Sequence, residues 1–201
     1  MHKMKKIVFA MTLLLASAAG YAQTATQVLD KAAQKLTAKS GVKADFKAST
    51  PQGTITGTIA VKGNKFVATT QHTKVWFDGK TQWTYMSRND EVNVSNPKDS
   101  ELQSLNPYNF INMYKKGYKS TMRKEGGNYV IHLTAESKAK KVQELFVTVD
   151  SKTNNPTQVK MLQGKKWTTF DVSNLKQESL PDAYFRFNAK DFPSAEVIDL
   201  R

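Results

Sequence analysis

Residues 75–85 read VWFDGKTQWTY, with an Asp-Gly pair between two runs of β-forming residues. Asp78-Gly79 predicts a two-residue hairpin turn, because a type I′ turn needs positive φ at both of its central positions. In that register Trp76 would pair with Thr81. Side chains alternate between the two faces of a strand, so one face of the hairpin is predicted to carry Trp76, Thr81, Trp83 and Tyr85. The opposite, polar face would carry Lys80, Gln82 and Thr84.

The composition limits what the chain can be. Its 201 residues carry 30 lysines and arginines against 17 acids, a net charge of +13, and no cysteine. The length suits one domain. Without cysteine there is no disulfide, thiolate metal site, cysteine nucleophile or cysteine-linked lipid anchor. The lysines cluster in turns and at outward strand positions, as they do on a solvated surface, so anionic headgroups or an acidic partner stay open as ligands.

The first residues are predicted to be a secretory signal rather than part of the fold. Residues 1–6 are basic, residues 7–20 are apolar but too short to span a bilayer, and Gly20 and Ala22 are small residues of the kind a signal peptidase reads. We expect cleavage of residues 1–22, which leaves residues 23–201 as a single domain. The mature chain is expected in the periplasm as a monomer, and export argues against nucleic acid as a ligand.

Periodicity predicts one helix followed by a meander of strands. Between residues 24 and 39 apolar side chains recur every three or four positions, so that Val28 and Leu36 share one face. From Val42 the period changes to two, and Leu133 and Val147 fall on the apolar faces of two later strands. Turn residues separate predicted strands at 42–48, 55–61, 66–68, on each side of the 75–85 hairpin, and at 91–95, 117–124, 128–134, 144–150, 157–162 and 167–175.

Residues 96–114 interrupt the meander with apolar spacings that suit short helical turns. The sequence thus predicts about ten or eleven strands and two helical elements. Amphipathic helices must cover an apolar surface, which argues against a filled, closed barrel. The predicted fold class is mostly β with α: a strongly curved, antiparallel, open (incomplete) β-barrel whose concave face is covered by helices.

The sequence gives no support to an enzyme. Its three histidines, His2, His72 and His132, include no pair at metal-binding spacing, and His132 should face outward because Ile131 and Leu133 face inward. There is no phosphate-binding glycine loop, nucleophile elbow or zinc-protease motif. We therefore expect no catalytic residue, no metal and no cofactor.

The order of several short motifs resembles that of the LolA family, periplasmic carriers of outer-membrane lipoproteins. Asp78-Gly79-Lys80-Thr81 with Trp83 and Tyr85 is similar to the family's D-G-K-T-x-W-x-Y. Other matching segments are Ala44-Asp45-Phe46, the strand from Gly57 to Phe66, the helix position from Asn106-Pro107 to Ile111, and the end of the chain from Phe185-Arg186-Phe187 through Val197-Ile198-Asp199. The resemblance covers nearly the whole mature chain.

The resemblance implies an incomplete barrel that shelters lipoprotein acyl chains under a helical lid. Its implied partners are an acylated lipoprotein cargo, an inner-membrane lipoprotein-releasing transporter and an outer-membrane receptor. We predict one continuous concave surface as the acyl-binding cavity, formed by Val42, Phe46, Ile59, Phe66, Trp76, Trp83, Tyr85, Leu133 and Val147. The predicted lid consists of Val28, Leu36, Phe110, Ile111 and Tyr114.

One departure from the family concerns how such a lid is held. The family's Arg-Pro pair after the V-K strand is replaced by Gly63-Asn64, and Lys65 lacks the planar fork of an arginine. We therefore expect burial of apolar side chains, not a polar latch at Lys65, to close the lid. A second functional interpretation stays open: a LolA-like binding or sensor domain for another lipid or amphiphile.

Overall fold

The computed structural model describes residues 23–98 and 113–201. Its helix, α1 (Ala25–Leu36), begins with a capping box in which the Thr24 side chain accepts from the Gln27 backbone and the Gln27 side chain accepts from the Thr24 backbone. The apolar stripe of α1 is fully buried and consists of Ala25, Val28, Leu29, Ala32 and Leu36. The predicted helix with Val28 and Leu36 on one face is confirmed.

Twelve strands form a single sheet in the described residues. Their bounds are β1 (Val42–Thr50), β2 (Gly53–Lys62), β3 (Lys65–Thr70), β4 (Thr73–Phe77), β5 (Gln82–Met86), β6 (Glu91–Ser95), β7 (Tyr118–Glu125), β8 (Asn128–Ala135), β9 (Val142–Asp150), β10 (Pro156–Gln163), β11 (Lys166–Gln177) and β12 (Glu196–Asp199). Their order across the sheet is β12-β6-β5-β4-β3-β2-β1-β11-β10-β9-β8-β7. β12 and β7 are its edges, so the sheet does not close into a barrel.

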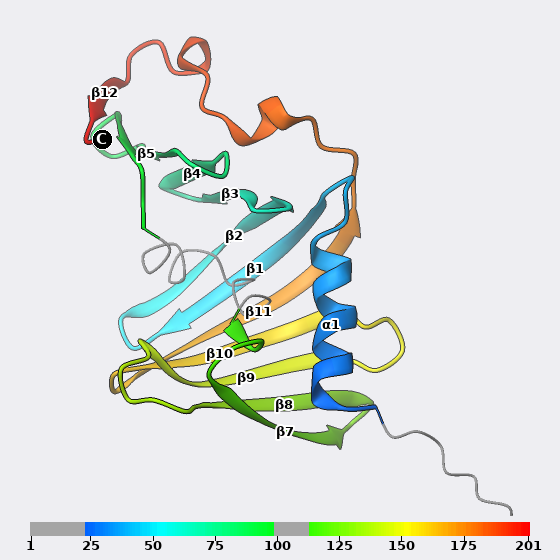
Figure 1. The fold of residues 1–201 in the computed structure, drawn as a ribbon. Helices are drawn as coiled ribbons and strands as arrows, with labels where there is room; N and C mark the ends of the chain where they lie inside the picture. Colours follow the sequence, from blue (N-terminus) through cyan, green and yellow to red (C-terminus); the bar gives the residue numbers. More distant parts are fainter. Residues whose placement is uncertain (1–22, 99–112) are drawn as a thin grey trace, which may run out of the picture.

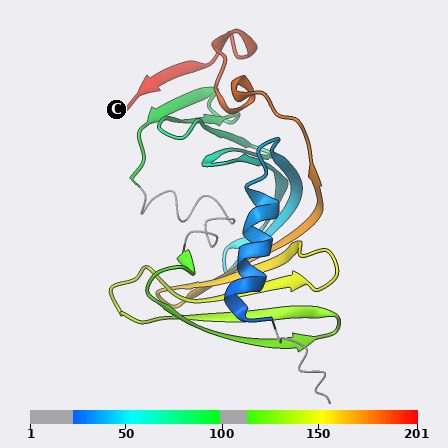
Figure 2. The same ribbon diagram turned by 45° about the vertical axis from the view of Figure 1, so that its right-hand side comes forward.

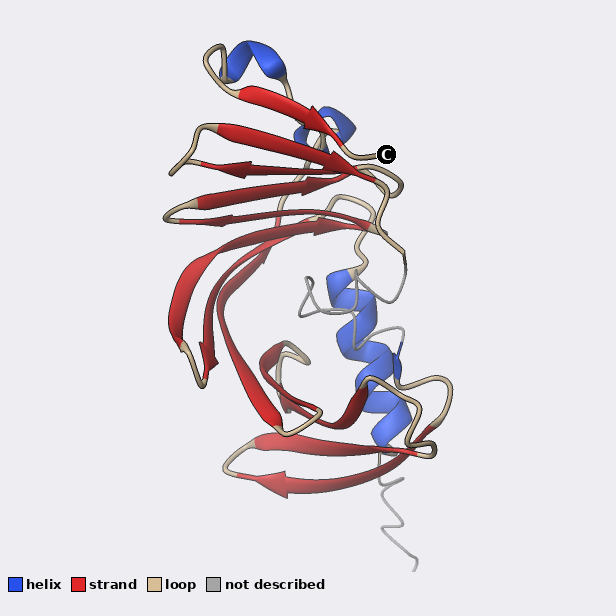
Figure 3. Ribbon diagram, turned by 90° about the vertical axis from the view of Figure 1, so that its left-hand side faces the viewer, coloured by secondary structure: helices blue, strands red, loops and turns tan. Residues whose placement is uncertain are grey.

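The predicted fold class, an open curved sheet with a helix on its concave face, is confirmed. Figures 2 and 3 show the sheet bending around α1. All neighbouring strands are antiparallel except β12 and β6, and β1 pairs with β11 to join the two arms of the meander. The sequence missed β12, whose four residues are mostly exposed and therefore carry no alternating pattern of burial. The predicted helical insertion at 96–114 lies mostly outside the described residues.

The hairpin between β4 and β5 has a longer loop than the two-residue turn predicted for Asp78-Gly79. Phe77 pairs with Gln82, and Trp76 pairs with Trp83 instead of Thr81. The Asp78 carboxylate accepts hydrogen bonds from the backbone N–H groups of Lys80 (3.1 Å) and Thr81 (2.9 Å), which stabilises a four-residue loop. The predicted register was wrong by two residues. Because side chains alternate with a period of two, this shift keeps every side chain on its predicted face, and Trp76, Trp83 and Tyr85 do share one face.

That aromatic face is the outer face of the sheet, which corrects the prediction of one continuous concave surface. Phe66 pairs with Phe77 on the side of α1, whereas its neighbour Val67 pairs with Trp76 on the opposite side. Adjacent residues of a strand point to opposite faces. Phe66 and Trp76 therefore cannot share a surface, and Trp83 and Tyr85 lie with Trp76.

After β11 the chain crosses the outer face of the sheet to reach β12 (Figure 1). This C-terminal segment, residues 178–195, contains two short 3-10 helices, η2 (Asp182–Phe185) and η3 (Ala189–Asp191), and η2 contacts β3. The two faces of the sheet are thus covered by opposite ends of the chain: the inner face by α1 and the outer face by the C-terminal segment.

Candidate functional site

The inner face of the sheet carries a large, mainly aliphatic cluster. α1 contributes its buried stripe, and the strands contribute alternate side chains from β1 to β4 and from β8 to β11. We call this set the inner-face cluster; its strand members include Val42, Ala44, Ile59, Val61, Phe66, Phe77, Ile131, Leu133, Leu145, Val147, Val149, Val159, Met161 and Val172. An apolar surface of this extent is suited to a long hydrocarbon ligand if α1 moves aside.

Most of the residues predicted for the cavity belong to this cluster. Val42, Ile59, Phe66, Leu133 and Val147 are buried in it. Phe46 is partly buried against it, with its ring over Gly57, where a Cβ atom would lie 2.8 Å from the ring. The same Cβ would lie 2.2 Å from the Thr69 carbonyl oxygen, so glycine leaves room for the neighbouring backbone as well as for the phenyl ring. The residues that the structure removes from the cavity are Trp76, Trp83 and Tyr85.

The described residues of the predicted lid also pack on the inner face. Val28 and Leu36 of α1 are fully buried there, and the ring of Tyr114 is buried beside them. Phe110 and Ile111 lie outside the described residues. The Tyr114 hydroxyl donates a hydrogen bond to the Asp30 carboxylate on α1. Burial, and then this hydrogen bond, raise the pKa of Tyr114 well above its ordinary value, so the hydroxyl remains a donor at neutral pH.

The inner face becomes polar toward β5 and β6. Thr84 and Asn93, together with Gln82 and Ser95, continue the rows that Val75 and Phe77 begin on β4. The Gln82 amide donates to the Thr84 hydroxyl at 3.1 Å, while its buried carbonyl oxygen has no hydrogen-bond partner in the described part of the chain. The predicted polar face of the hairpin thus lies inside, where it adds hydrogen-bonding groups beside the aliphatic cluster.

The outer face carries a separate, aromatic cluster. Its buried members are Ala60, Val67, Trp76, Leu180 and Phe185, and Trp83, Tyr85, Phe187 and Phe192 pack against them. The Trp76 ring meets those of Phe187 and Phe192 edge-on, each at 5.5 Å between centroids. We call this set the outer-face cluster. In the sequence, the signal for this cluster is the set of phenylalanines that follow β11, namely Phe185, Phe187 and Phe192.

Ion pairs fasten the C-terminal segment to the same face. The Asp182 carboxylate lies 3.0 Å from the Lys62 ammonium and 2.8 Å from that of Lys65. Their hydrogen bonds, that of Lys65 first, lower the pKa of Asp182 to about 2. Lys65 therefore contacts the C-terminal segment on the outer face, and not α1.

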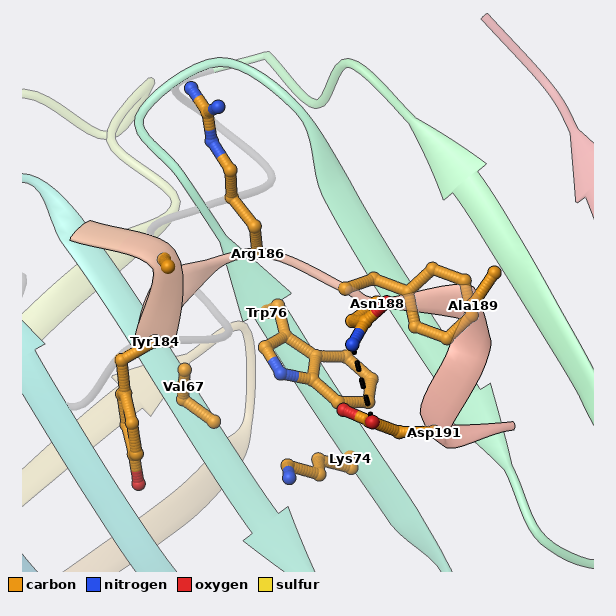
Figure 4. Close-up of a pocket in the computed structure, with 10 residues that line it drawn as sticks. Val67, Lys74, Trp76, Tyr184, Arg186, Asn188, Ala189 and Asp191 are labelled. Carbon is orange, nitrogen blue, oxygen red and sulfur yellow. Dashed lines mark hydrogen bonds between the residues drawn. The ribbon is translucent and has the colours of Figure 1, made fainter. Parts of the chain in front are cut away.

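A pocket of about 520 Å³ lies between the C-terminal segment and the outer side of β3 and β4. Figure 4 shows the Trp76 indole at its centre, with Lys74 and Asp191 on one side and Tyr184 on the other. Sequence reasoning missed this pocket, because it depends on a segment that folds back over strands more than a hundred residues earlier.

The described residues hold no group of histidine, aspartate and glutamate side chains that could bind a metal. His132 faces outward as predicted, stacked on Phe146 and 3.0 Å from the Glu144 carboxylate. Within the two described ranges, no helix has the length and apolar character needed to cross a membrane.

The fold and its inner face define a class of protein: an open β-barrel with an apolar concave surface beneath a helix. The sequence profile of the family described as outer membrane lipoprotein carrier protein LolA matches residues 15–165, and the chain belongs to this family. Its members are binding and carrier proteins rather than enzymes, and they generally act outside the cytoplasm. No curated protein matches this sequence.

Several solved structures are similar to this chain at low sequence identity. An uncharacterized conserved protein from Thermus thermophilus is 13% identical, with a TM-score of 0.60 over 88% of this chain and 99% of that one. A LolA superfamily protein from Nitrosomonas europaea is 14% identical, with a TM-score of 0.45 over 83% and 99% of the two chains. A putative outer membrane lipoprotein-sorting protein domain from Vibrio parahaemolyticus is 15% identical, with a TM-score of 0.44 over 81% and 97%.

Proposed function

We propose that this protein is a soluble periplasmic carrier that shelters the acyl chains of a lipoprotein between α1 and the inner face of the sheet. In this proposal residues 1–22 are a cleaved signal and residues 23–201 a single domain. The carrier receives its cargo from an inner-membrane transporter and gives it to a receptor at the outer membrane. The observation that carries the proposal is the mainly aliphatic inner-face cluster, which the amphipathic helix α1 covers.

The energetics favour exchange of α1 for an acyl chain. A sixteen-carbon chain left in water costs roughly 12 kcal/mol, at about 0.8 kcal/mol for each methylene. Each large side chain of α1 gains about 1.5–3 kcal/mol from burial, and Val28, Leu29 and Leu36 are fully buried. Because hydrocarbon contacts have no directional requirement, a chain can replace these contacts nearly one for one. The free-energy cost of loading a chain, and that of releasing it, then both stay small.

The polar end of the inner face gives the cargo a direction. An acylated lipoprotein terminus has ester and amide groups directly beside its chains, and these must be hydrogen-bonded when they leave water. Gln82 and Thr84, with Asn93 beside them, lie next to the aliphatic surface. The Gln82 carbonyl oxygen has no hydrogen-bond partner among the residues that the structure describes. A lipoprotein would place its chains under α1 and its amide N–H groups toward β5 and β6.

A matched pair of substitutions tests where cargo binds. Ala44 on the inner face of β1 and Ala60 on the outer face of β2 are 4% and 3% exposed, so a leucine overfills either site to a similar degree. Each change is expected to cost about 1–3 kcal/mol of stability. Ala44→Leu should reduce uptake of a triacylated lipoprotein from detergent several-fold, while Ala60→Leu should not, as measured by gel filtration. An equal or larger loss with Ala60→Leu contradicts the proposal.

Depletion of the protein from its native cell separates transport from the alternative, a binding or sensor domain for another lipid or amphiphile. A carrier predicts lipoproteins retained at the inner membrane. Normal delivery of lipoproteins to the outer membrane would leave binding intact and reject transport.

A further inference from the structure

The outer pocket lies on the opposite side of the sheet from the inner-face cluster. η2 and η3 of the C-terminal segment form one wall, and Val67, Lys74 and Trp76 of β3 and β4 form the floor. Its volume of about 520 Å³ falls in the range of small-molecule sites. Its walls combine aromatic surface with a few charged groups, a composition typical of binding sites for small amphiphilic molecules.

The indole N–H of Trp76 faces this pocket as a hydrogen-bond donor. Trp76 is 4% exposed as a whole, and its indole nitrogen belongs to the part that stays accessible. No acceptor for the indole N–H lies among residues 23–98 and 113–201, so the donor is open to a group that enters the pocket. Figure 4 shows the indole nitrogen turned toward the space between Val67, Tyr184 and Lys74. A tryptophan side chain combines a large apolar ring with one N–H donor, so it can hold both the apolar and the polar part of a ligand. An oxygen atom of a ligand in the pocket would satisfy this donor.

The charges beside the indole favour an anionic oxygen. The Lys74 ammonium lies 4.8 Å from the centre of the Trp76 ring and has no carboxylate within ion-pair distance in the described part of the chain. Of the other charged groups, Arg186 lies 3.4 Å from the Asp78 carboxylate, and Asp191 accepts a hydrogen bond from Asn188. Figure 4 shows the Arg186 side chain pointing away from the indole, so Lys74 is the cation placed to bind a ligand together with the Trp76 N–H.

We propose that the outer pocket binds a small amphiphile with a carboxylate or phosphate head. The head accepts hydrogen bonds from the Trp76 indole and the Lys74 ammonium. The apolar body lies against Val67 and the ring of Phe187, with Tyr184 at the rim. This second site is independent of the proposed carrier function, since it uses no residue of the inner-face cluster.

Titration of the full mature chain with octanoate, octyl phosphate and neutral 1-octanol tests the site. The readout is the indole N–H resonance of Trp76 in ¹H–¹⁵N spectra, assigned by its loss in Trp76→Phe. Either anionic probe should shift this resonance downfield and saturably, and the tighter of the two identifies the head. A shift with neither anion, or the same shift with octanol, would overturn the proposal.

The structure offers a matched control for Lys74. Lys160 lies 4.6 Å from the centre of the Trp167 ring, a similar lysine–tryptophan contact that joins β10 and β11. Lys74→Gln should weaken binding at Trp76 about tenfold or more, as loss of a charged hydrogen bond does, whereas Lys160→Gln should leave it unchanged. Equal effects of the two variants, or probe-induced shifts confined to the methyl groups of Leu133 and Val147, would reject the outer site.

Discussion

On the inner face of the sheet the side chains that meet α1 are mostly aliphatic, whereas on the outer face those that meet the C-terminal segment are mostly aromatic. Aliphatic contacts depend on area alone, so another hydrocarbon can replace them. Edge-on rings and the ion pairs of Asp182 fix both distance and angle. We therefore expect α1 to give way to cargo on the inner face, and the C-terminal segment to stay in place on the outer face.

The largest effect is expected at the anchor of the outer cover. Phe185 is fully buried, and its replacement by alanine should cost about 3–5 kcal/mol. Phe185→Ala should release the C-terminal segment while lipoprotein uptake persists, as followed by urea unfolding and hydrogen exchange. Its neighbour Tyr184 is 39% exposed and serves as the control. If Tyr184→Ala destabilises the protein as much, Phe185 is not the anchor.

The corresponding substitution on α1 is expected to reduce stability somewhat less, and to alter cargo binding as well. Leu29→Ala removes a fully buried side chain and should cost about 2–5 kcal/mol. Because it loosens the cover that cargo must displace, uptake of lipoprotein should rise. Lys31→Ala, on the exposed side of the same helix, should change neither quantity. Reduced uptake in Leu29→Ala would mean that α1 holds the cargo instead of yielding to it.

Two tyrosine–aspartate hydrogen bonds allow the covers to be compared directly. Tyr114 bonds Asp30 of α1, and Tyr85 bonds Asp90 at 3.0 Å on the outer-face side. Tyr114→Phe should cost about 1.5 kcal/mol and speed hydrogen exchange in α1. Tyr85→Phe should leave α1 exchange unchanged. Equal acceleration of α1 in the two variants would show that the faces are not independent.

The smallest effect is a pH dependence confined to the outer cover. The folded pKa of Asp182, about 2, lies below the ordinary aspartate value of about 3.9. Its ion pairs therefore contribute stability above about pH 4, and this contribution is lost as the pH falls toward 2. Hydrogen exchange of η2 should increase across that window in the natural protein. In Asp182→Asn this step should be absent, and its persistence would assign the transition to another group.

The sequence predicted the strands and the helix well but misplaced the hairpin's faces. The alternation of side chains along the strands shows that Trp76, Trp83 and Tyr85 share one face of the sheet. It does not show whether that face is the inner or the outer one. That choice depends on Phe66 pairing with Phe77, and on the C-terminal segment supplying Leu180 and Phe185 as an outer cover. The aromatic face is buried as expected, but by a segment distant in sequence. The outer pocket could not be predicted for the same reason.

Photochemical labelling gives the most direct test of where cargo lies. A lipoprotein whose acyl chains carry a diazirine near their ends is loaded onto the natural protein and irradiated, and the adducts are mapped by mass spectrometry. If the chains lie under α1, adducts should fall on α1, β8 and β9, at positions such as Leu29, Leu133 and Val147. Adducts concentrated on Trp76, Phe187 and Phe192 would place the chains on the outer face and contradict the account.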